Sequence, residues 1–345
     1  MSSQITVGIV GASGYTGEEL VRLLRFHPRL ELVLLTSRQK AGRAVKENFP
    51  WAPDHLFYCD LEPSEISSLA DVFFLALPHG ESRKFVKALV STSKIIIDLS
   101  ADFRIKNPAE YKKYYGHEAA PEDLLSQAVY GQPETNKNAL IGAHLVACAG
   151  CYPTSVILPL APLLEKKIIQ TNKIIISSMS GISGAGRRTE EEYSFCECNE
   201  NIRVYGGTNH RHIPEIEQEL TRFAGEPVVV QFLPHLVPLS RGIYTTIAAQ
   251  LQPEYASLRT KDVLNILAEK YVQEPFVRVL PEGVMPRINA VAHTNRCDIS
   301  ALVDARTGNL LLFSALDNLI KGAGGQAVQC LNLLLGWEQS IGLPR

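Results

Sequence analysis

ITVGIVGASGYTG, residues 5–17, joins an apolar run to a turn with a glycine at every third position. We expect Ile5–Val10 to form a buried strand and Glu18–Arg25 to form a helix. Glycines at such a junction allow a tight turn, and the helix N-terminus offers free N–H groups to a pyrophosphate. A glycine turn alone is a weak signal, but its place after a first strand favours a dinucleotide site. The residues predicted to bind the dinucleotide are Gly11, Ser13, Gly14, Tyr15, Thr16 and Gly17.

Further apolar runs follow this turn. Strands are expected at Leu30–Thr36, Asp71–Leu77, Lys94–Leu99 and Leu145–Ala147, with a loop-rich stretch from Asp102 to Asn138. Strands this apolar are typical of a parallel sheet that is covered on both faces. The first 150 residues therefore predict a doubly wound α/β domain.

After Cys151 the pattern changes. Helices are expected at Tyr152–Lys167 and Asn318–Leu335, with few helices between them. The strands predicted between them are Lys173–Ser178, Val228–Phe232, Gly242–Leu251, Val277–Leu280, Cys297–Val303 and Leu310–Leu316. Strands grouped in this way predict a second α/β domain with a mixed or mostly antiparallel sheet.

Composition limits the function classes. The 345 residues are 46% hydrophobic and 20% charged, which is enough to build globular cores. The formal net charge of −2 and the absence of a basic stripe argue against nucleic acid as a partner. The start of the chain has no basic region, and the apolar stretch Leu140–Leu164 is interrupted by prolines, so neither a secretory signal nor a membrane span is expected. Seven cysteines without a signal peptide predict free thiols in a reducing cytoplasm.

The end of the second predicted strand points to the form of the cofactor. NAD-specific folds tend to place an acidic residue there, against the ribose hydroxyls. Here the strand ends in Thr36-Ser37-Arg38. A hydroxyl and a guanidinium suit a 2′-phosphate, so Ser37 and Arg38 predict NADP. The alternative is that Arg38 only solvates the end of a loop.

A nucleophile is predicted in Ala149-Gly150-Cys151-Tyr152-Pro153-Thr154. A strand ends here, glycine turns the chain, and Pro153 falls where the first turn of a helix should begin. A thiol at a helix N-terminus has a lowered pKa, and the thiolate can attack an activated carbonyl. The alternative for Cys151 is a buried structural cysteine.

Proton transfer has one concentrated candidate, Asn209-His210-Arg211-His212-Ile213-Pro214-Glu215. On an extended segment the two histidines would point the same way. Pro214 would open a helix and place Glu215 one turn from His212, close enough to orient the imidazole. A metal half-site is the alternative, but no further His or Cys pair has suitable spacing, and no metal is expected.

Three segments are candidates for anion or cofactor contacts. Asp98–Arg104 and Pro238–Gly242 each carry an arginine, whose planar fork suits phosphate and carboxylate oxygens. Either arginine could equally be a surface ion-pair partner. Ser180–Gly186 is a second glycine-rich loop, for which close approach to a ligand is one explanation and a tight turn another.

Several motifs together resemble the N-acetyl-gamma-glutamyl-phosphate reductase family, which is related to aspartate-semialdehyde dehydrogenase. The resemblance runs nearly end to end. The motifs are GASGYTG from Gly11, DLSADFR from Asp98, GCYPT from Gly150, SGISGAGR from Ser180, HRHIPEI from His210, PHLVPLSRG from Pro234 and DNLIKGAGGQAVQ from Asp317. One departure is Cys148-Ala149, where the family often has Asn-Pro.

The resemblance implies a fold and a reaction. It implies a Rossmann-type NADP-binding domain over residues 1–150, a catalytic and dimerisation-type domain over 151–316, and a C-terminal helix within 317–345 that returns to the first domain. The reaction would be NADPH-dependent reductive dephosphorylation of N-acetyl-gamma-glutamyl phosphate, a step of arginine biosynthesis. The enzyme would work in the cytoplasm as a homo-oligomer, a dimer or a tetramer, on a small-molecule acyl phosphate.

The resemblance also implies roles for individual residues. Cys151 would be the nucleophile, and His210, His212 and Glu215 the acid/base group. Substrate anions would be bound by Ser100, Arg104 and Arg241. The nicotinamide side of the cofactor would be contacted by Ser180, Gly181, Ser183 and Asn318.

Three alternatives remain open from the residues. A sister enzyme that acts on aspartyl or aminoadipyl phosphate would use identical chemistry. A regulator that senses NADP without catalysis would keep the nucleotide fold. Cys148–Cys151 is also a C-x-x-C motif, and with Cys196 and Cys198 it could form a zinc site.

Overall fold

The computed structural model describes residues 4–187 and 190–345. The chain divides into two compact units, one of residues 1–149 with 323–343 and one of residues 150–322 with 344–345. Each contains one seven-stranded sheet. No helix in the described part of the chain has the length and apolar character that crossing a bilayer would need.

The first unit is built on a parallel sheet, as predicted. Its strands run in the order β3-β2-β1-β4-β5-β7-β6, and every neighbouring pair is parallel. The central strand β1 lies between β2 and β4, so the strand order reverses beside it, where such sheets bind nucleotides. The strands are β1 (Ile5–Val10), β2 (Leu30–Thr36), β3 (Tyr58–Cys59), β4 (Val72–Leu75), β5 (Ile95–Asp98), β6 (Ala128–Gly131) and β7 (Leu145–Cys148).

Helices pack on this sheet and correct one prediction. The stretch Asp102–Asn138 is not loop-rich, because it contains three helices and the strand β6. These helices are six to eight residues long, too short to show an apolar period. The helices of the unit are α1 (Tyr15–Leu24), α2 (Ser82–Leu89), α3 (Pro108–Tyr115), α4 (Glu122–Gln127), α5 (Pro133–Leu140) and α11 (Gly325–Leu334).

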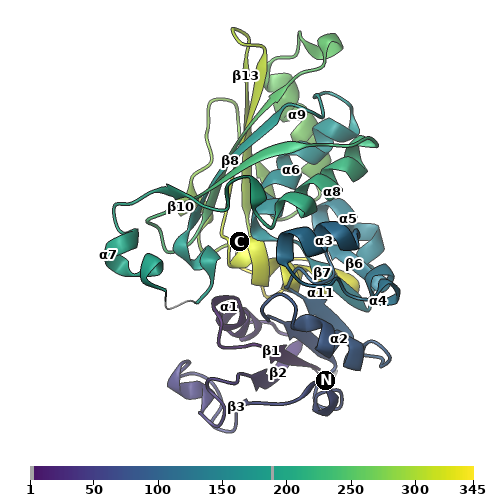
Figure 1. The fold of residues 1–345 in the computed structure, drawn as a ribbon, viewed down its shortest axis with the longest axis vertical. Helices are drawn as coiled ribbons and strands as arrows, with labels where there is room; N and C mark the ends of the chain where they lie inside the picture. The colour runs from purple at the N-terminus through teal and green to yellow at the C-terminus, as the bar shows by residue number, and fades with distance from the viewer. Residues whose placement is uncertain (1–3, 188–189) are drawn as a thin grey trace. The chain divides into compact units, whose positions relative to one another are not determined.

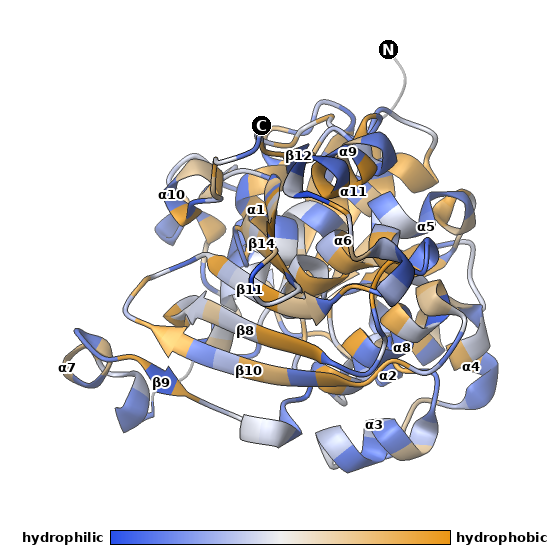
Figure 2. Ribbon diagram, turned by 90° about the horizontal axis from the view of Figure 1, so that it is seen from above, coloured by the Kyte–Doolittle hydropathy of each residue, from blue (hydrophilic) through white to orange (hydrophobic). Residues whose placement is uncertain are grey.

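The second unit is built on a mixed sheet, also as predicted. Its order is β12-β13-β14-β11-β8-β10-β9, with β8 parallel to β10 and antiparallel to β11. Figure 2 shows hydrophobic residues along β8, β10 and β11, which lie side by side. The strands are β8 (Ile174–Gly181), β9 (Arg203–Val204), β10 (Val230–Val237), β11 (Ile243–Gln250), β12 (Val277–Val279), β13 (Cys297–Asp304) and β14 (Asn309–Leu316).

Three long helices of the second unit pack on one face of its sheet (Figure 1). Alternate side chains of β11 are buried under them, which is the pattern of a sheet with one covered face. The helices of this unit are α6 (Cys151–Glu165), α7 (Phe195–Cys198), α8 (Ile213–Ala224), α9 (Thr260–Tyr271) and α10 (Ile288–Val291). The three that cover the sheet are α6, α8 and α9.

The C-terminal helix differs from the single helix predicted over Asn318–Leu335. A π-helical turn, Ile320–Gly324, comes first, and α11 follows at Gly325. The carboxylate of Asp317 accepts the N–H groups of Leu319 and Ile320 at 2.9 and 3.2 Å, which fixes the start of the wide turn. Helix α11 belongs to the first unit.

Candidate active site

Cys151 is the first residue of α6 and is half-buried. Gly150 precedes the helix in extended conformation, with φ −70° and ψ 159°. The backbone N–H and the hydroxyl of Thr154 both donate to the carbonyl of Gly150 at 2.9 Å. The Cys151 sulfur therefore stands at the positive end of a 15-residue helix, which favours a thiolate.

Glu215 holds the same turn from another helix. Its side chain is fully buried in the first turn of α8, and Oε1 accepts the N–H of Gly150 at 2.8 Å. The sequence predicted that Glu215 orients His212. The contact with Gly150 gives the carboxylate a task that the sequence did not predict, because it ties the nucleophile turn to α8.

His210 and His212 come together, although not by alternation along an extended segment. His210 is extended, but His212 has helical angles (φ −82°, ψ −10°) and directly precedes α8. Their ring centroids lie 5.1 Å apart at an interplanar angle of 64°. The prediction of an extended segment was wrong because α8 starts at Ile213 and its helical geometry already includes His212.

The second glycine-rich loop follows β8 and is anchored by Asn318. Asn318 accepts the N–H of Gly242 at 2.7 Å and donates to the hydroxyl of Ser183 at 3.0 Å. Ser180 is buried and its hydroxyl donates to the carbonyl of Gly181 at 2.9 Å. Four residues that the sequence assigned to one contact region, Ser180, Gly181, Ser183 and Asn318, are thus neighbours in the structure.

Arg241 reaches this region beside Asn318. Its Nη1 lies 3.1 Å from Oδ2 of the fully buried Asp317, and its side chain is 17% exposed. Asp317 also binds backbone N–H groups, so this buried carboxylate orients the guanidinium. The chain is also closely packed in the π-helical turn Ile320–Gly324, where a Cβ on Gly322 would lie 2.7 Å from the Cβ of Cys151.

The turn between β1 and α1 in the first unit has little room for side chains. A Cβ on Gly17 would lie 2.4 Å from the carbonyl oxygen of Gly11, and Gly11 itself has φ +88°. Packing therefore requires both glycines. Gly14, which precedes α1, has only one atom near its Cβ position, at 3.9 Å. Space beside Gly14 at a helix N-terminus fits a dinucleotide phosphate.

The end of β2 lies next to this turn. Ser37 is buried, and its hydroxyl donates to that of Ser13 at 2.8 Å. The Arg38 side chain is 76% exposed, with Nε 4.0 Å from Oδ1 of Asp60. Tyr15 and Thr16 open α1, and Tyr15 is 36% exposed. The predicted cofactor residues of the first unit thus gather at one edge of its sheet.

Ser100 and Arg104 are buried at the carboxyl end of β5. The Ser100 hydroxyl donates to Asp98 at 2.7 Å, and Nη2 of Arg104 donates to the carbonyl of Leu99 at 2.6 Å. Burial, and then the neighbouring Asp102 carboxylate, raise the pKa of Asp98 to about 6. These two predicted anion ligands belong to the first unit, and Arg241 belongs to the second.

Comparison with known proteins identifies the family. Residues 6–143 match the model of the semialdehyde dehydrogenase NAD binding domain, and residues 151–318 match that of the semialdehyde dehydrogenase dimerisation domain. N-acetyl-gamma-glutamyl-phosphate reductase of Pelotomaculum thermopropionicum is 47% identical over 98% of this chain and 97% of that protein. The enzyme of the same name from Citrifermentans bemidjiense is 48% identical over 98% of both. The chain belongs to the N-acetyl-gamma-glutamyl-phosphate reductase family.

Membership confirms the predicted family and class of activity: the chain is an oxidoreductase of arginine biosynthesis with a nicotinamide-dinucleotide-binding domain. Solved structures confirm the fold. Aspartate semialdehyde dehydrogenase II of Vibrio cholerae, solved in complex with ASA, covers 97% of this chain at a TM-score of 0.74 and 17% identity, and this chain covers 99% of it. The Candida albicans aspartate semialdehyde dehydrogenase with NADP has a TM-score of 0.72 at 17% identity, over 98% of this chain and all of that one.

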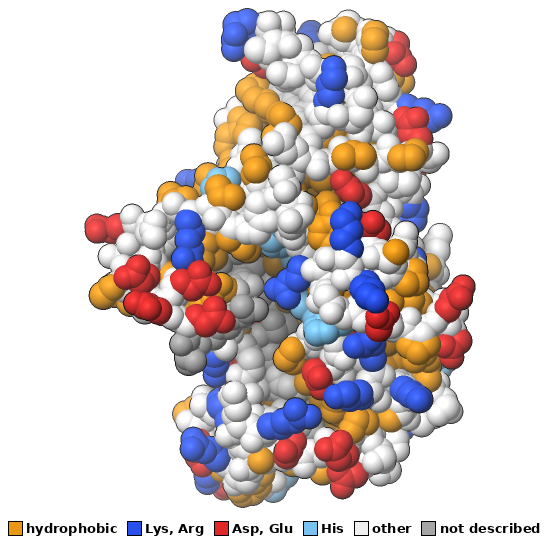
Figure 3. All heavy atoms as spheres, viewed as in Figure 1, with side chains coloured by type: hydrophobic (Ala, Val, Ile, Leu, Met, Phe, Trp, Pro, Cys, Tyr) orange, Lys and Arg blue, Asp and Glu red, His pale blue; other side chains and the backbone are white. Residues whose placement is uncertain are grey.

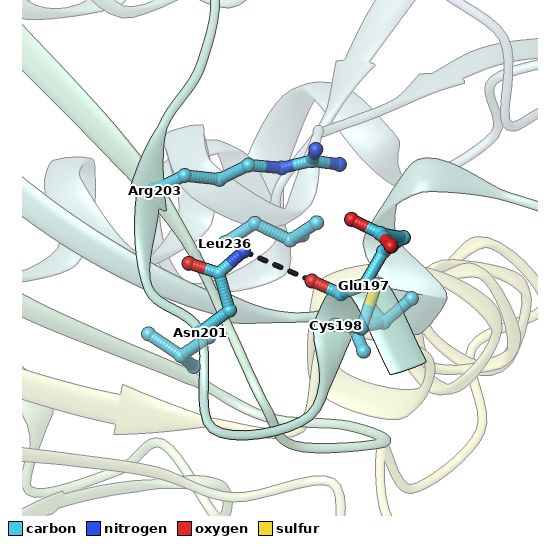
Figure 4. A pocket seen from close by; sticks show the side chains of 7 residues that line it. Glu197, Cys198, Asn201, Arg203 and Leu236 are labelled. Carbon is cyan, nitrogen blue, oxygen red and sulfur yellow. Dashed lines mark hydrogen bonds between the residues drawn. The ribbon is translucent and has the colours of Figure 1, made fainter. Parts of the chain in front are cut away.

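One further cysteine of this reductase-family chain, Cys198, has a structural place. Cys198 is buried, and its sulfur donates to the carbonyl of Glu192 at 3.3 Å. It lines a cavity of about 10 Å³, room for one water, with Asn201 and Arg203 (Figure 4). In the described part of the chain, no three or more His, Cys, Asp or Glu side chains are grouped to hold a metal ion.

The surface around α7 is acidic. Exposed carboxylates of Glu190, Glu191, Glu192 and Glu197 gather there (Figure 3). Such a surface repels phosphate-bearing ligands. We therefore place no anion site at α7.

Sequence reasoning missed three aromatic residues beside the histidines. The rings of Tyr152, Tyr205 and Phe232 lie 5.5, 5.3 and 5.3 Å from that of His210, centroid to centroid. Tyr152 follows the nucleophile directly, which was the one local signal. Tyr205 and Phe232 reach the site only through the folding of β9 and β10, and no sequence spacing announces that.

Proposed function

We propose that this chain reduces N-acetyl-gamma-glutamyl phosphate to N-acetylglutamate 5-semialdehyde with NADPH, through a thioester on Cys151. The observation that carries the proposal is the position of Cys151 at the N-terminus of α6. The same unit contains the imidazoles of His210 and His212 and the Arg241 guanidinium, which is ion-paired with Asp317. A thiolate, proton-transfer groups and an anion ligand are what acyl-phosphate chemistry needs.

The steps follow from these residues. The Cys151 thiolate attacks the acyl carbon, and the carbon–oxygen bond to phosphate breaks. Phosphate leaves without needing a proton. NADPH, when bound, supplies the hydride that reduces the thioester. His212 then protonates the oxygen of the thiohemiacetal and takes the proton back as the carbon–sulfur bond breaks and the aldehyde forms.

Glu215 and the arginines have supporting roles in this proposal. Glu215 keeps Gly150 in place, so that the sulfur stays at the start of α6. Arg241, held by Asp317, binds a substrate anion. Ser100 and Arg104 belong to the acyl-phosphate site.

We assign the cofactor as NADP. The adenosine phosphate would be bound by Ser37 and Arg38 at the end of β2, with Ser13 bonded to Ser37. Gly11, Gly14, Tyr15, Thr16 and Gly17 would hold the pyrophosphate. Ser180, Gly181, Ser183 and Asn318 would contact the nicotinamide side.

We further propose that the chain forms a homo-oligomer through the face of the mixed sheet opposite the one that α6, α8 and α9 cover. Ile175 and Met179 on β8 are 47% and 39% exposed, and Phe313 on β14 shares their face. This apolar face fits a dimer of two copies, in keeping with the dimerisation-domain match. The charge variant Met179→Glu should shift the mass measured by light scattering toward the monomer. The seven free cysteines support a reducing cytoplasm as its compartment.

The deciding experiment is NADP reduction in the presence of phosphate. N-acetylglutamate semialdehyde should be oxidised much faster than aspartate semialdehyde or aminoadipate semialdehyde. A preference for either of the latter would assign the chain to a sister reaction. NADPH binding without oxidation of any of the three aldehydes would instead identify a regulator.

A further inference from the structure

His210 lies in an aromatic enclosure made by three elements. Tyr152 comes from α6, Phe232 from β10, and Tyr205 from the segment after β9. All three rings meet the imidazole edge to face, at interplanar angles of 88°, 71° and 75°. The backbone closes the enclosure, because the Cβ position of Gly206 lies 3.1 Å from Cδ2 of His210.

One ring nitrogen of His210 has a defined hydrogen bond. Its Nδ1 lies 3.1 Å from the backbone nitrogen of His212, which donates. A backbone N–H can only donate, so Nδ1 must be an acceptor and carry no proton. A neutral imidazole then carries its proton on Nε2. Protonating Nδ1 would set two donors against each other.

The surroundings also oppose a charged ring. Burial, and then the neighbouring Arg211 guanidinium, lower the pKa of His210 to about 4. The other titratable groups near the ring are His212 on its own segment, Tyr152 on α6, and Tyr205. Cys151 acts electrostatically on the two phenols. His210 therefore stays neutral in the pH range in which enzymes work.

A hydroxyl pair keeps the enclosure in place. Tyr205 donates to the hydroxyl of Tyr152 at 2.9 Å, and Tyr152 in turn approaches the carbonyl of His235 at 3.5 Å. Burial raises the pKa of both phenols, so both remain protonated. The pair links the residue after the nucleophile to β10 and to the segment after β9.

We propose that Tyr152 and Tyr205 are positioning residues that hold His210 as a neutral hydrogen-bond donor, with its proton fixed on Nε2. His210 then stabilises the negative charge that develops on the substrate oxygen, and His212 alone moves the proton. The inference deepens the proposed function, because the oxygen concerned is that of the thiohemiacetal. Neutral donors aimed at developing charge are an effective form of catalysis.

The tautomer can be observed directly in the full-length protein labelled with ¹⁵N-histidine. The ring signals of His210, assigned by their loss in His210→Gln, should report a proton on Nε2 from pH 5 to pH 8, without titration. A midpoint between pH 6 and pH 7, or a proton on Nδ1, would overturn the proposal. This measurement needs no substrate, so it stands even if the proposed reaction is wrong.

Kinetics then test the positioning role. Tyr205→Phe keeps the ring and removes the hydroxyl, so kcat should fall about three- to tenfold while KM for the substrate stays constant. The His210 signals should broaden or begin to titrate in this variant. Tyr255→Phe, in the short 3-10 helix Pro253–Tyr255 that follows β11, is the matched control and should keep both kcat and the spectrum. A folded Tyr205→Phe enzyme with unchanged kcat and an unchanged His210 spectrum would show that the hydroxyl pair does no positioning.

Discussion

Glu215 accepts the backbone N–H of Gly150 at 2.8 Å, across 65 residues of sequence. A fully buried carboxylate thereby fixes the residue that precedes the nucleophile. Removing it should leave a buried donor unsatisfied, which costs about 1–3 kcal/mol. Glu215→Ala should therefore lower the free energy of unfolding by that amount and slow alkylation of Cys151, because the sulfur no longer stays at the start of α6.

The controls for this prediction lie on the same residue and the same helix. Glu215→Gln keeps an acceptor oxygen and should retain most of the stability and reactivity. Glu217 accepts the N–H of Val230 at 3.0 Å, so Glu217→Ala should lose stability without changing alkylation. Mass spectrometry of the Cys151 peptide after iodoacetamide treatment gives the rate. Equal alkylation rates in Glu215→Ala and the parent would show that Glu215 does not position the nucleophile turn.

The cofactor prediction concerns Arg38 and its neighbour Asp60. A guanidinium bound to a 2′-phosphate contributes about 1.5–3 kcal/mol, which is about 10- to 100-fold in affinity. Arg38→Asp should weaken NADPH binding by such a factor and leave NADH binding nearly unchanged. Asp60→Asn removes the competing carboxylate 4.0 Å away and should strengthen NADPH binding. Fluorescence titration measures both, and equal affinities for NADPH and NADH in the parent would contradict the assignment.

Local signals explain why part of the fold was predictable. Ile5–Val10 and Leu30–Thr36 have in the structure the bounds that their sequences predicted, because each apolar run ends at a turn residue or a polar one. The helices between Asp102 and Asn138 escaped prediction. Their best signal is a cap, as at Asn107, which accepts the N–H groups of Ala109 and Glu110, and a cap without an apolar period is easily taken for a turn.

The site shows the same division between local and long-range information. The position of Cys151 at the start of a helix could be predicted, because strand, glycine and helix start are adjacent in sequence. The hydroxyl pair of Tyr152 and Tyr205 spans 53 residues, and Arg241 meets Asp317 across 76. Such contacts depend on how the strands pair, which no spacing within one segment reveals.

Arg241 should affect both binding and stability. Arg241→Leu removes the proposed anion ligand and leaves Asp317 without its guanidinium. KM for the substrate should rise about 10-fold or more, and the free energy of unfolding should fall by several kcal/mol, about 3–5 for a broken buried pair. Arg241→Lys should restore part of the stability but little of the binding, since an ammonium lacks the planar fork.

Arg104→Leu tests the second arginine among the predicted anion ligands, and it too should raise KM. Its guanidinium donates to the carbonyl of Leu99, so this variant also loses a hydrogen bond within its loop. Steady-state kinetics and denaturant unfolding separate the two effects. If KM is unchanged in both arginine variants, their role is structural.

The lowered pKa of His210 predicts that the stability of the protein depends on pH. This pKa is about 4 in the folded protein and about 6.5 in an unfolded chain, so below pH 6.5 the unfolded state binds more protons. Stability should therefore fall as pH decreases from 7 to 5, by at most about 1.4 kcal/mol per pH unit from this residue. His210→Gln should show a weaker dependence over that range, measured by urea unfolding at each pH.

The titration of Asp98 changes the stability in the opposite direction over part of this pH range. The pKa of Asp98 is raised to about 6, so between about 4 and 6 the folded protein binds more protons than the unfolded chain, and acid stabilises it. Asp98 is present in both the parent and His210→Gln, and its contribution cancels in their difference. An identical pH dependence in the two proteins would mean that His210 is not kept neutral by the fold.

The last prediction separates the two cysteines of the C-x-x-C motif. Cys148 ends β7, is 1% exposed, and has its sulfur 3.9 Å from the carbonyl of Ala323. No helix begins at Cys148, whereas Cys151 is the first residue of α6. Cys148→Ala should therefore keep most of the activity and lose only about 1 kcal/mol of stability, for one buried sulfur.

Cys151→Ala should have the reverse effect. It should abolish NADP reduction with N-acetylglutamate semialdehyde and phosphate, because no thiohemiacetal can form, yet bind NADPH with the parent's affinity. The assay is run in excess reductant, so that any disulfide is broken. If reduced and folded Cys148→Ala were inactive, both sulfurs would take part in the chemistry and the motif would be a redox pair. Activity in Cys151→Ala would require another nucleophile, and the thioester mechanism would fail with it.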